Sequence, residues 1–112
     1  MTPRQNNLLY PLPCASNHEV TETILASKGL RLERVVSLGQ SSPDSFWYDQ
    51  EDTEWVMVLT GGARLAIAGE AEDRHLGPGE SIYLPAHCRH RVTWTDPDQP
   101  TVWLALFIHN EP

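Results

Sequence analysis

Two stretches decide how this chain folds: Glu54-Trp-Val-Met-Val-Leu-Thr-Gly61 and, beyond a further seventeen residues, Gly79-Glu-Ser-Ile-Tyr-Leu-Pro85-Ala-His87-Cys-Arg-His90. The apolar run Trp55–Leu59 is typical of a strand covered on both faces, because a half-exposed strand alternates apolar and polar residues. Gly61-Gly62 supplies a turn after it. In the second stretch, Ser81–Leu84 is a short strand that ends at Pro85. Short strands separated by turns favour an antiparallel β-fold.

The chain from Val20 onward carries the same kind of signal. Val20–Leu25 is rich in β-branched residues, Ser27-Lys28-Gly29 provides a turn, and Leu30–Val36 alternates apolar with charged side chains. A short helix from Ser16, capped through Glu19, is the alternative for the first segment, and its β-branched residues disfavour it. Further strands are expected at Ala63–Ala68, Glu72–Leu76, Arg89–Thr95 and Thr101–His109. Eight or nine such strands predict an all-β fold, closed or sandwiched so that its edges are protected.

Length and charge exclude several classes of function. The chain has 112 residues, enough for one domain, and its 40% apolar content is too high for a disordered protein. The net charge is −7, and protonating all five histidines would leave −2, so we expect no nucleic-acid partner and no membrane attachment. Residues 1–18 contain three prolines and predict an irregular N-terminal arm without a signal peptide. A cytoplasmic location follows, with Cys14 and Cys88 as thiols.

The two quoted stretches resemble the two sequence motifs of the cupin superfamily. The first matches in a glutamate that is followed, after six intervening residues, by glycine; the second matches in the spacing of its glycine, proline and histidine. The resemblance covers about residues 39–108. It implies a double-stranded β-helix, or jelly-roll barrel, as a single domain over residues 19–112 that follows the arm. The matching positions are Glu54, Gly61, Gly79, Pro85 and His90.

The resemblance also implies a divalent metal in the barrel mouth, which the family binds through three histidines and one glutamate. Glu54 and His90 stand at the glutamate and last histidine positions, whereas Tyr48 and Gln50 occupy the other two. Residues 48, 50 and 54 share parity, so a regular strand turns their side chains to one side. We therefore expect Gln50, Glu54 and His90 to bind Fe, Mn, Ni or Zn, with Asp49 as a replacement ligand where a bulge changes parity. The alternative is a buried, hydrogen-bonded Glu54–His90 pair without metal.

Three residues are predicted to face the substrate and to take part in catalysis: Tyr48, Tyr83 and His87. A phenol in the barrel mouth can hydrogen-bond a substrate or act as an acid. For Tyr83 the alternative is a packed core residue. His87 lies in a turn three residues before His90, and its alternative is a histidine that faces solvent.

Tryptophan is abundant for so short a chain. Each indole buries a large area, and few domains of this size can enclose four of them. We therefore expect a homodimer, and the cupin resemblance implies the same, since small members commonly pair through sheet faces and exchanged N-terminal segments. The four residues are Trp47, Trp55, Trp94 and Trp103.

Two functions remain open from the sequence. The first is a metal-dependent enzyme that acts on a small polar organic molecule in the barrel mouth, of dioxygenase, isomerase, decarboxylase or dehydratase type, because the fold alone does not select the reaction. The second is a metal-free binding or sensory module, which the missing pair of histidines favours. A third and weaker idea is a metal-free acid–base enzyme that uses Tyr83 or His87.

Overall fold

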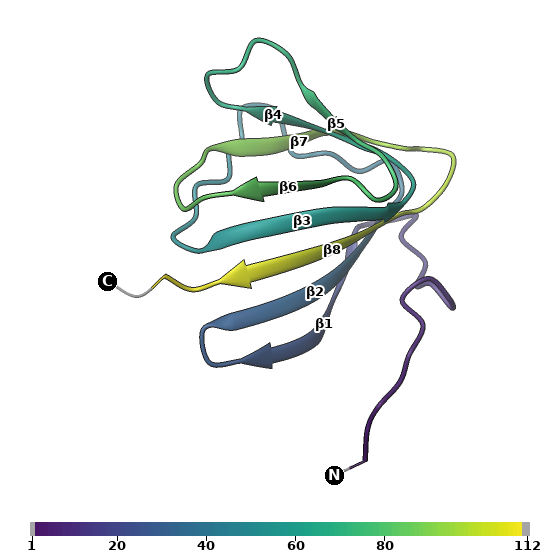
Figure 1. Cartoon of the computed structure of the whole chain (residues 1–112). Coiled ribbons are helices and arrows are strands. Elements are labelled where there is room, and N and C mark those ends of the chain that lie inside the picture. Colours follow the sequence, from purple (N-terminus) through teal and green to yellow (C-terminus); the bar gives the residue numbers. More distant parts are fainter. Residues whose placement is uncertain (1, 111–112) are drawn as a thin grey trace.

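The protein is built from two antiparallel sheets. The computed structural model describes residues 2–110, which contain eight strands and no helix, and thus no helix able to cross a membrane (Figure 1). One sheet has five strands in the order β1-β2-β8-β3-β6, and the other has three in the order β5-β4-β7. The expected all-β jelly roll is confirmed. The strands are β1 (Val20–Ser27), β2 (Leu30–Ser37), β3 (Thr53–Thr60), β4 (Ala63–Ile67), β5 (Arg74–Leu76), β6 (Ser81–Leu84), β7 (His90–Thr95) and β8 (Thr101–Ile108).

The expected strands form with small shifts at their ends. The helical alternative from Ser16 is wrong, because Val20 begins a strand that pairs with β2. Covering both faces of β3 was also expected, and this is wrong: Val56 and Val58 are buried, but Trp55 and Met57 on the opposite face are only half-buried. The continuous apolar run of β3 therefore supplies a core face and an apolar outer face.

The main hydrophobic core lies between the two sheets. Val58 of β3 is fully buried, and Leu65 of β4 is 2% exposed. Trp103 and Ala105 of β8 belong to the same cluster. Alternation along each strand sends every second side chain into this space. Toward one end of the space the inward residues change from apolar to polar, and there the candidate site forms.

The N-terminal arm covers a second, smaller cluster. Ala15 packs with Val36 and Val102, which are both fully buried. The arm is also tied to β2 through the guanidinium of Arg34, which donates to the carbonyl oxygen of Leu8. These contacts fix the path by which the chain enters β1.

The outer face of the five-stranded sheet carries an apolar row that crosses every strand. Directly paired residues of neighbouring strands point to the same face, and the pairings run without interruption from β1 through β2, β8 and β3 to β6. Two members, Leu25 and Tyr83, are 49% and 63% exposed. We call this the outer row; its members are Leu25, Leu32, Leu106, Trp55 and Tyr83.

Gly61 sets the turn between β3 and β4. Its φ is +88°, and a Cβ there would meet the hydroxyl of Thr101, with the Thr101 Cα at 2.6 Å and the Pro100 carbonyl oxygen at 2.8 Å. Thr101 is fully buried and its hydroxyl bonds to the backbone of Gly62. No larger residue fits without moving the start of β8.

We predict that Gly61→Ala lowers the free energy of unfolding more than Gly69→Ala does. Both glycines have positive φ, which disfavours a side chain by about 1–2 kcal/mol. Only Gly61 is crowded, since no atom lies within 4 Å of a Cβ at Gly69, and overpacking adds about 1–3 kcal/mol. Urea unfolding of both variants measures the difference. Equal losses would contradict the close approach of β8.

Candidate functional site

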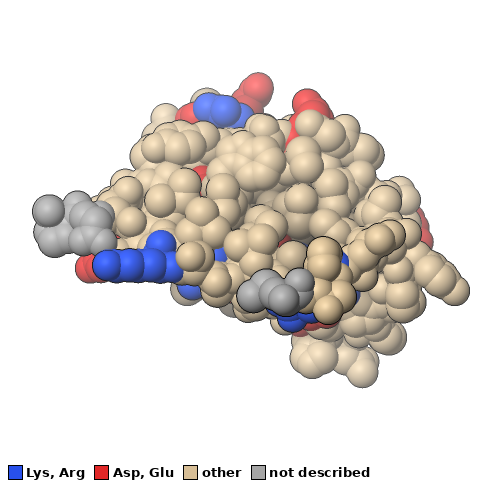
Figure 2. Space-filling view, turned by 60° about the horizontal axis from the view of Figure 1, so that its bottom comes forward, with Lys and Arg blue, Asp and Glu red and all other residues tan. Residues whose placement is uncertain are grey.

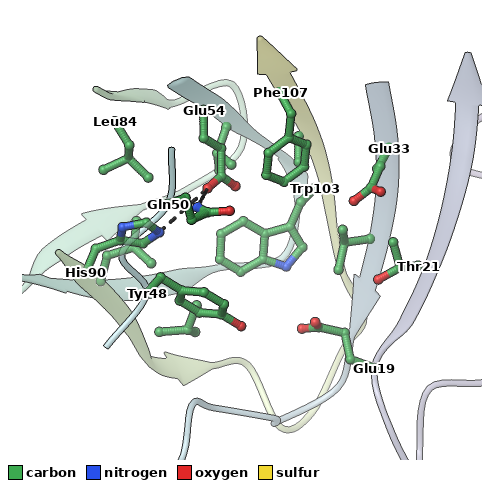
Figure 3. A pocket seen from close by; sticks show the side chains of 15 residues that line it. Glu19, Thr21, Glu33, Tyr48, Gln50, Glu54, Leu84, His90, Trp103 and Phe107 are labelled. Atoms are coloured by element: carbon green, nitrogen blue, oxygen red, sulfur yellow. Dashed lines mark hydrogen bonds and ion pairs between the residues drawn. The ribbon is translucent and has the colours of Figure 1, made fainter. Parts of the chain in front are cut away.

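A cavity of about 200 Å³ opens between the two sheets and is lined from both (Figure 3). Its inner part is apolar, made by residues of β3, β4, β7 and β8 that include Val56, Leu65, Val92 and Trp103. Its polar part holds three carboxylates, of Glu19, Glu33 and Glu54, together with Thr21, Tyr48, Gln50 and His90. The structure thus places Tyr48, Gln50, Glu54 and His90, all predicted from the sequence, around one space.

His90 is the most enclosed polar group of this set. Its side chain is 7% exposed, and its Nδ1–H donates to the carbonyl oxygen of Cys88 at 2.8 Å. The bond to a carbonyl fixes which nitrogen carries this proton, so Nε2 is the nitrogen that faces Glu54. The backbone of His90 pairs with that of Tyr48, with N–O distances of 2.7 and 3.2 Å. His90 is thus held by its side chain, through Nδ1, and by its backbone.

Glu54 enters the cavity from β3, and its side chain is 12% exposed. Gln50 donates its amide N–H to Glu54 Oε1 at 2.9 Å. The same oxygen lies 3.6 Å from Nε2 of His90, an ion-pair distance that is too long for a hydrogen bond. Glu54 therefore accepts a hydrogen bond from Gln50, whereas its Oε1 and Nε2 of His90 are separated by 3.6 Å without one.

Two opposing effects act on His90. Desolvation by burial lowers the pKa of His90, but the interaction with Glu54, the backbone bond to Cys88 and the negative charge of Glu54 together raise it above its usual value. The net direction is upward. The imidazolium form is therefore more populated near neutral pH than in a free histidine.

Tyr48 forms a wall of the cavity and does not point at Glu54. Its ring stacks on the His90 ring, with centroids 5.3 Å apart and an angle of 23° between the planes. Figure 3 shows its hydroxyl directed toward Glu19. Desolvation, followed by the charges of Glu19 and Glu54, raises the pKa of Tyr48. The side chain is a neutral phenol that can donate a hydrogen bond.

The prediction that Tyr83 and His87 face the substrate is wrong, because neither side chain lines the cavity. Tyr83 pairs with Trp55 on the outer face and is 63% exposed, because it has the opposite parity from the inward Leu84. His87 has a positive φ of 63°, which turns its side chain outward to bond Asp49 at 2.7 Å. Asp49 is consequently engaged outside the cavity, and the alternative that it replaces Gln50 as a ligand finds no support in its position.

Three acidic or aromatic residues of the cavity were missed by the sequence reasoning. Glu19 directly precedes β1, Glu33 comes from β2 at the far side of the five-stranded sheet, and Trp103 comes from β8. The alternation of Leu30–Val36 did indicate that Glu33 shares a face with Val35. Nothing in the local pattern indicated that this face curves around to meet Glu54.

The donors present fit a metal only in part. Among the described residues, no group of three His, Cys, Asp or Glu side chains is placed to hold a metal ion. Nε2 of His90 and the carboxylate of Glu54 are ligands that divalent ions accept. Gln50 turns its amide nitrogen toward Glu54, so it would serve only after rotation of the amide presents its oxygen. The predicted set of Gln50, Glu54 and His90 is thus gathered but not arranged as three ligands.

A comparison with models of known protein families identifies the family of this chain. The model described as a cupin domain matches residues 34–107, which include both motifs and all but the first strand. The chain belongs to the cupin family. No curated protein matches its sequence.

Solved cupin structures agree with this assignment. A protein of Ralstonia eutropha JMP134, named a putative mannose-6-phosphate isomerase, is 44% identical, with 96% of this chain and 100% of that chain covered and a TM-score of 0.93. A cupin superfamily protein from Desulfitobacterium hafniense DCB-2 is 17% identical, with 96% and 94% covered and a TM-score of 0.71. A protein of unknown function from Streptococcus pyogenes is 16% identical, with 100% and 92% covered and a TM-score of 0.76. The last two show the fold alone.

We predict that Glu54→Gln lowers the pKa of His90, because the variant removes the charge that favours the imidazolium. Stability from a raised histidine pKa is fully present below the unfolded-state value of about 6.5 and is lost as the pH rises through the folded-state pKa. The stability difference between wild type and variant should therefore shrink in that direction. NMR titration of His90 and thermal unfolding between pH 5 and 8 measure both. Asp49→Asn, beside exposed His87, is the control, and an unchanged His90 titration in Glu54→Gln would contradict the pairing.

Proposed function

We propose that this cupin binds a small polar molecule in the cavity and transfers a proton on it through His90 and Glu54. The observation that supports this proposal most directly is the position of Nε2 of His90. Its imidazole is almost fully buried, its other nitrogen is anchored on Cys88, and Nε2 stands 3.6 Å from Glu54 without a hydrogen bond among the described residues. A ring nitrogen in this position can bond a polar group of a ligand that enters the cavity. The cavity volume of about 200 Å³, below the usual range of roughly 300–1,000 Å³ for ligand sites, limits that ligand to a small molecule.

Each neighbour of His90 supports this role. The bond to Cys88 keeps one proton on Nδ1, so proton transfer occurs at Nε2. Glu54 stabilises the charged imidazole, and the amide of Gln50 keeps the Glu54 carboxylate in place. The stacked ring of Tyr48 covers the imidazole and restricts water. The 44% identity to the protein named a putative mannose-6-phosphate isomerase adds support for an isomerase-type reaction, in which a proton moves beside a carbonyl group.

The test measures the exchange of C–H for C–D beside a carbonyl group. Proton NMR in D2O monitors this exchange in a panel of small hydroxy-, amino- and sugar carbonyl compounds. We expect the wild-type protein to catalyse exchange in at least one compound and His90→Ala to slow it about 100-fold, the usual effect of removing a general acid or base. Tyr83→Phe, outside the cavity, should keep the wild-type rate.

Equal exchange in wild type and His90→Ala would reject the proposal. A compound that raises the melting temperature equally in wild type and in the double variant Glu54→Ala, His90→Ala would instead support the metal-free binding module.

Metal-dependent catalysis is the second candidate, and one observation favours it. A histidine whose Nδ1–H bonds a carbonyl, while Nε2 faces a carboxylate, has the outer hydrogen bond that metal-binding histidines use. Glu54, His90 and a rotated Gln50 would hold an ion of Fe, Mn, Ni or Zn, which when bound would polarise a substrate oxygen. Elemental analysis of protein purified without chelator should then find about one equivalent in wild type and none in His90→Ala. Metal that persists in His90→Ala would count against this site.

We also propose a cytoplasmic homodimer. The cytoplasmic location is supported by Cys14 and Cys88, which are free thiols, as a reducing compartment favours. The homodimer is supported by the outer row, which presents apolar side chains on all five strands. Figure 2 shows few charged side chains over the middle of the face in view. A second copy covering the outer row would bury this apolar surface.

We predict that Leu25→Glu combined with Tyr83→Glu converts the protein to a monomer. Both residues lie in the outer row and are exposed within one chain, so the change places charges in the contact without entering the core. Light scattering after size exclusion at about 100 µM measures the mass. Leu9→Glu, also exposed but in the arm, is the matched control. A wild-type monomer, or a double variant that stays dimeric, would refute this interface.

A further inference from the structure

We propose that the ligand of this cavity carries a positive charge, as an organic ammonium group held between the carboxylate of Glu19 and the aromatic wall. This inference rests on the proposed function, since it concerns the ligand of the same cavity. It names the substrate class that the fold and the neighbouring proteins leave open. It is argued from the charges inside the cavity, from what holds Glu19 in place, and from the rings around it.

The charges inside the cavity do not balance. Three carboxylates line it, and no lysine or arginine does among the described residues. Glu33 is paired with Arg31 at 2.8 Å, and Glu54 is paired with His90. Glu19 is exposed at the cavity and makes no ion pair in the part of the chain that the structure describes, so its charge is accessible to a ligand as well as to water.

A buried hydroxyl fixes Glu19 at the cavity. The indole Nε1–H of Trp103 donates to Oγ of Ser37 at 3.1 Å, and the Ser37 hydroxyl donates to Glu19 Oε2 at 2.7 Å. Because Ser37 is fully buried and its single proton goes to Glu19, the bond requires Glu19 to accept. This bond holds the Glu19 carboxylate at the cavity, although the residue itself is exposed.

Aromatic rings surround the same space. Figure 3 shows Tyr48, Trp103 and Phe107 around the cavity, with Glu19 and Glu33 across from Glu54. The faces of such rings attract cations. Phe107 already receives one, since the Arg31 guanidinium stands 4.4 Å from its ring centroid. An ammonium group entering beside Glu19 would meet a carboxylate and the aromatic wall together, and the Nε2 gap at His90 would remain for a polar group of the same ligand.

The same lining disfavours a phosphate group. A phosphate needs cationic or multiple N–H donors. The indole N–H of Trp103 is used by Ser37, an amide N–H of Gln50 by Glu54, and the imidazole of His90 is a single cationic donor that already faces Glu54. A phosphate would also face the negative charge of Glu19. The phosphorylated substrate in the name of the Ralstonia eutropha protein is therefore not the ligand class that this cavity selects.

The test compares probes that differ in charge but little in shape. Choline is matched with 3,3-dimethylbutan-1-ol, its neutral isostere, and mannose 6-phosphate serves as the anionic probe. Binding to the full chain is measured by calorimetry and by the NMR shift of the Trp103 indole N–H. We expect choline to bind at least tenfold more tightly than the neutral isostere, and mannose 6-phosphate to bind more weakly than either. Neutral or anionic probes that bind as tightly as choline would overturn the proposal, as would absence of choline binding at 10 mM.

Matched variants separate this inference from the proposed function. Glu19→Gln should weaken choline at least tenfold and leave the neutral isostere unchanged, whereas Glu72→Gln, the same charge change at an exposed position outside the cavity, should alter neither. Unfolding midpoints confirm that each variant folds. Choline binding that survives in Glu19→Gln would refute the ammonium site. Equal C–H exchange in wild type and His90→Ala, with choline still preferred over the neutral isostere, would reject the proton transfer only, so the two proposals fail separately.

Discussion

The site depends on one contact between the two sheets, the approach of His90 to Glu54. Glu54 belongs to the five-stranded sheet and His90 to the three-stranded sheet, and the two side chains lie 3.6 Å apart where the backbone of Tyr48 pairs with that of His90. That pairing also stacks the Tyr48 ring on the imidazole. One backbone bridge thus positions three of the polar groups of the cavity, and a shift by one residue would turn them away together.

A buried pair of this kind stabilises a fold only weakly, since removing two polar groups from water opposes their attraction. The structure retains it beside an apolar core that includes Leu65 and Trp103 and that already holds the sheets together. His90 and Glu54 add no packing that apolar side chains would not supply better. Their place in the cavity is therefore better explained by what they do to a ligand than by stability.

The sequence predicted the part of the site that follows from local alternation. Residues 48, 50 and 54 face one space as predicted, although residues 49–52 are irregular and β3 begins only at Thr53, so the regular strand assumed in the prediction is absent. The turn at Gly61 lies where the glycines indicated. Tyr83 was misplaced because parity gives relative and not absolute orientation. His87 was misplaced because its positive φ reverses its direction within a turn. For Glu33 the alternation indicated only which neighbours share its face, and Glu19 was not predicted, because no local pattern encodes the curvature of a five-stranded sheet.

Similarity to a solved structure shows the fold of this chain but not the charge of its ligand. The 44% identity to the Ralstonia eutropha protein and the TM-score of 0.93 concern 96% of this chain, and they support the cupin fold. Ligand charge, by contrast, depends on a few side chains: Arg31 neutralises Glu33, while Glu19 receives only the neutral hydroxyl of Ser37. A single basic residue beside Glu19 would reverse the preference without changing the fold. The name of a neighbour can thus support the proposed reaction type, which involves only His90 and Glu54, whereas the substrate must be argued from the charges that line this cavity.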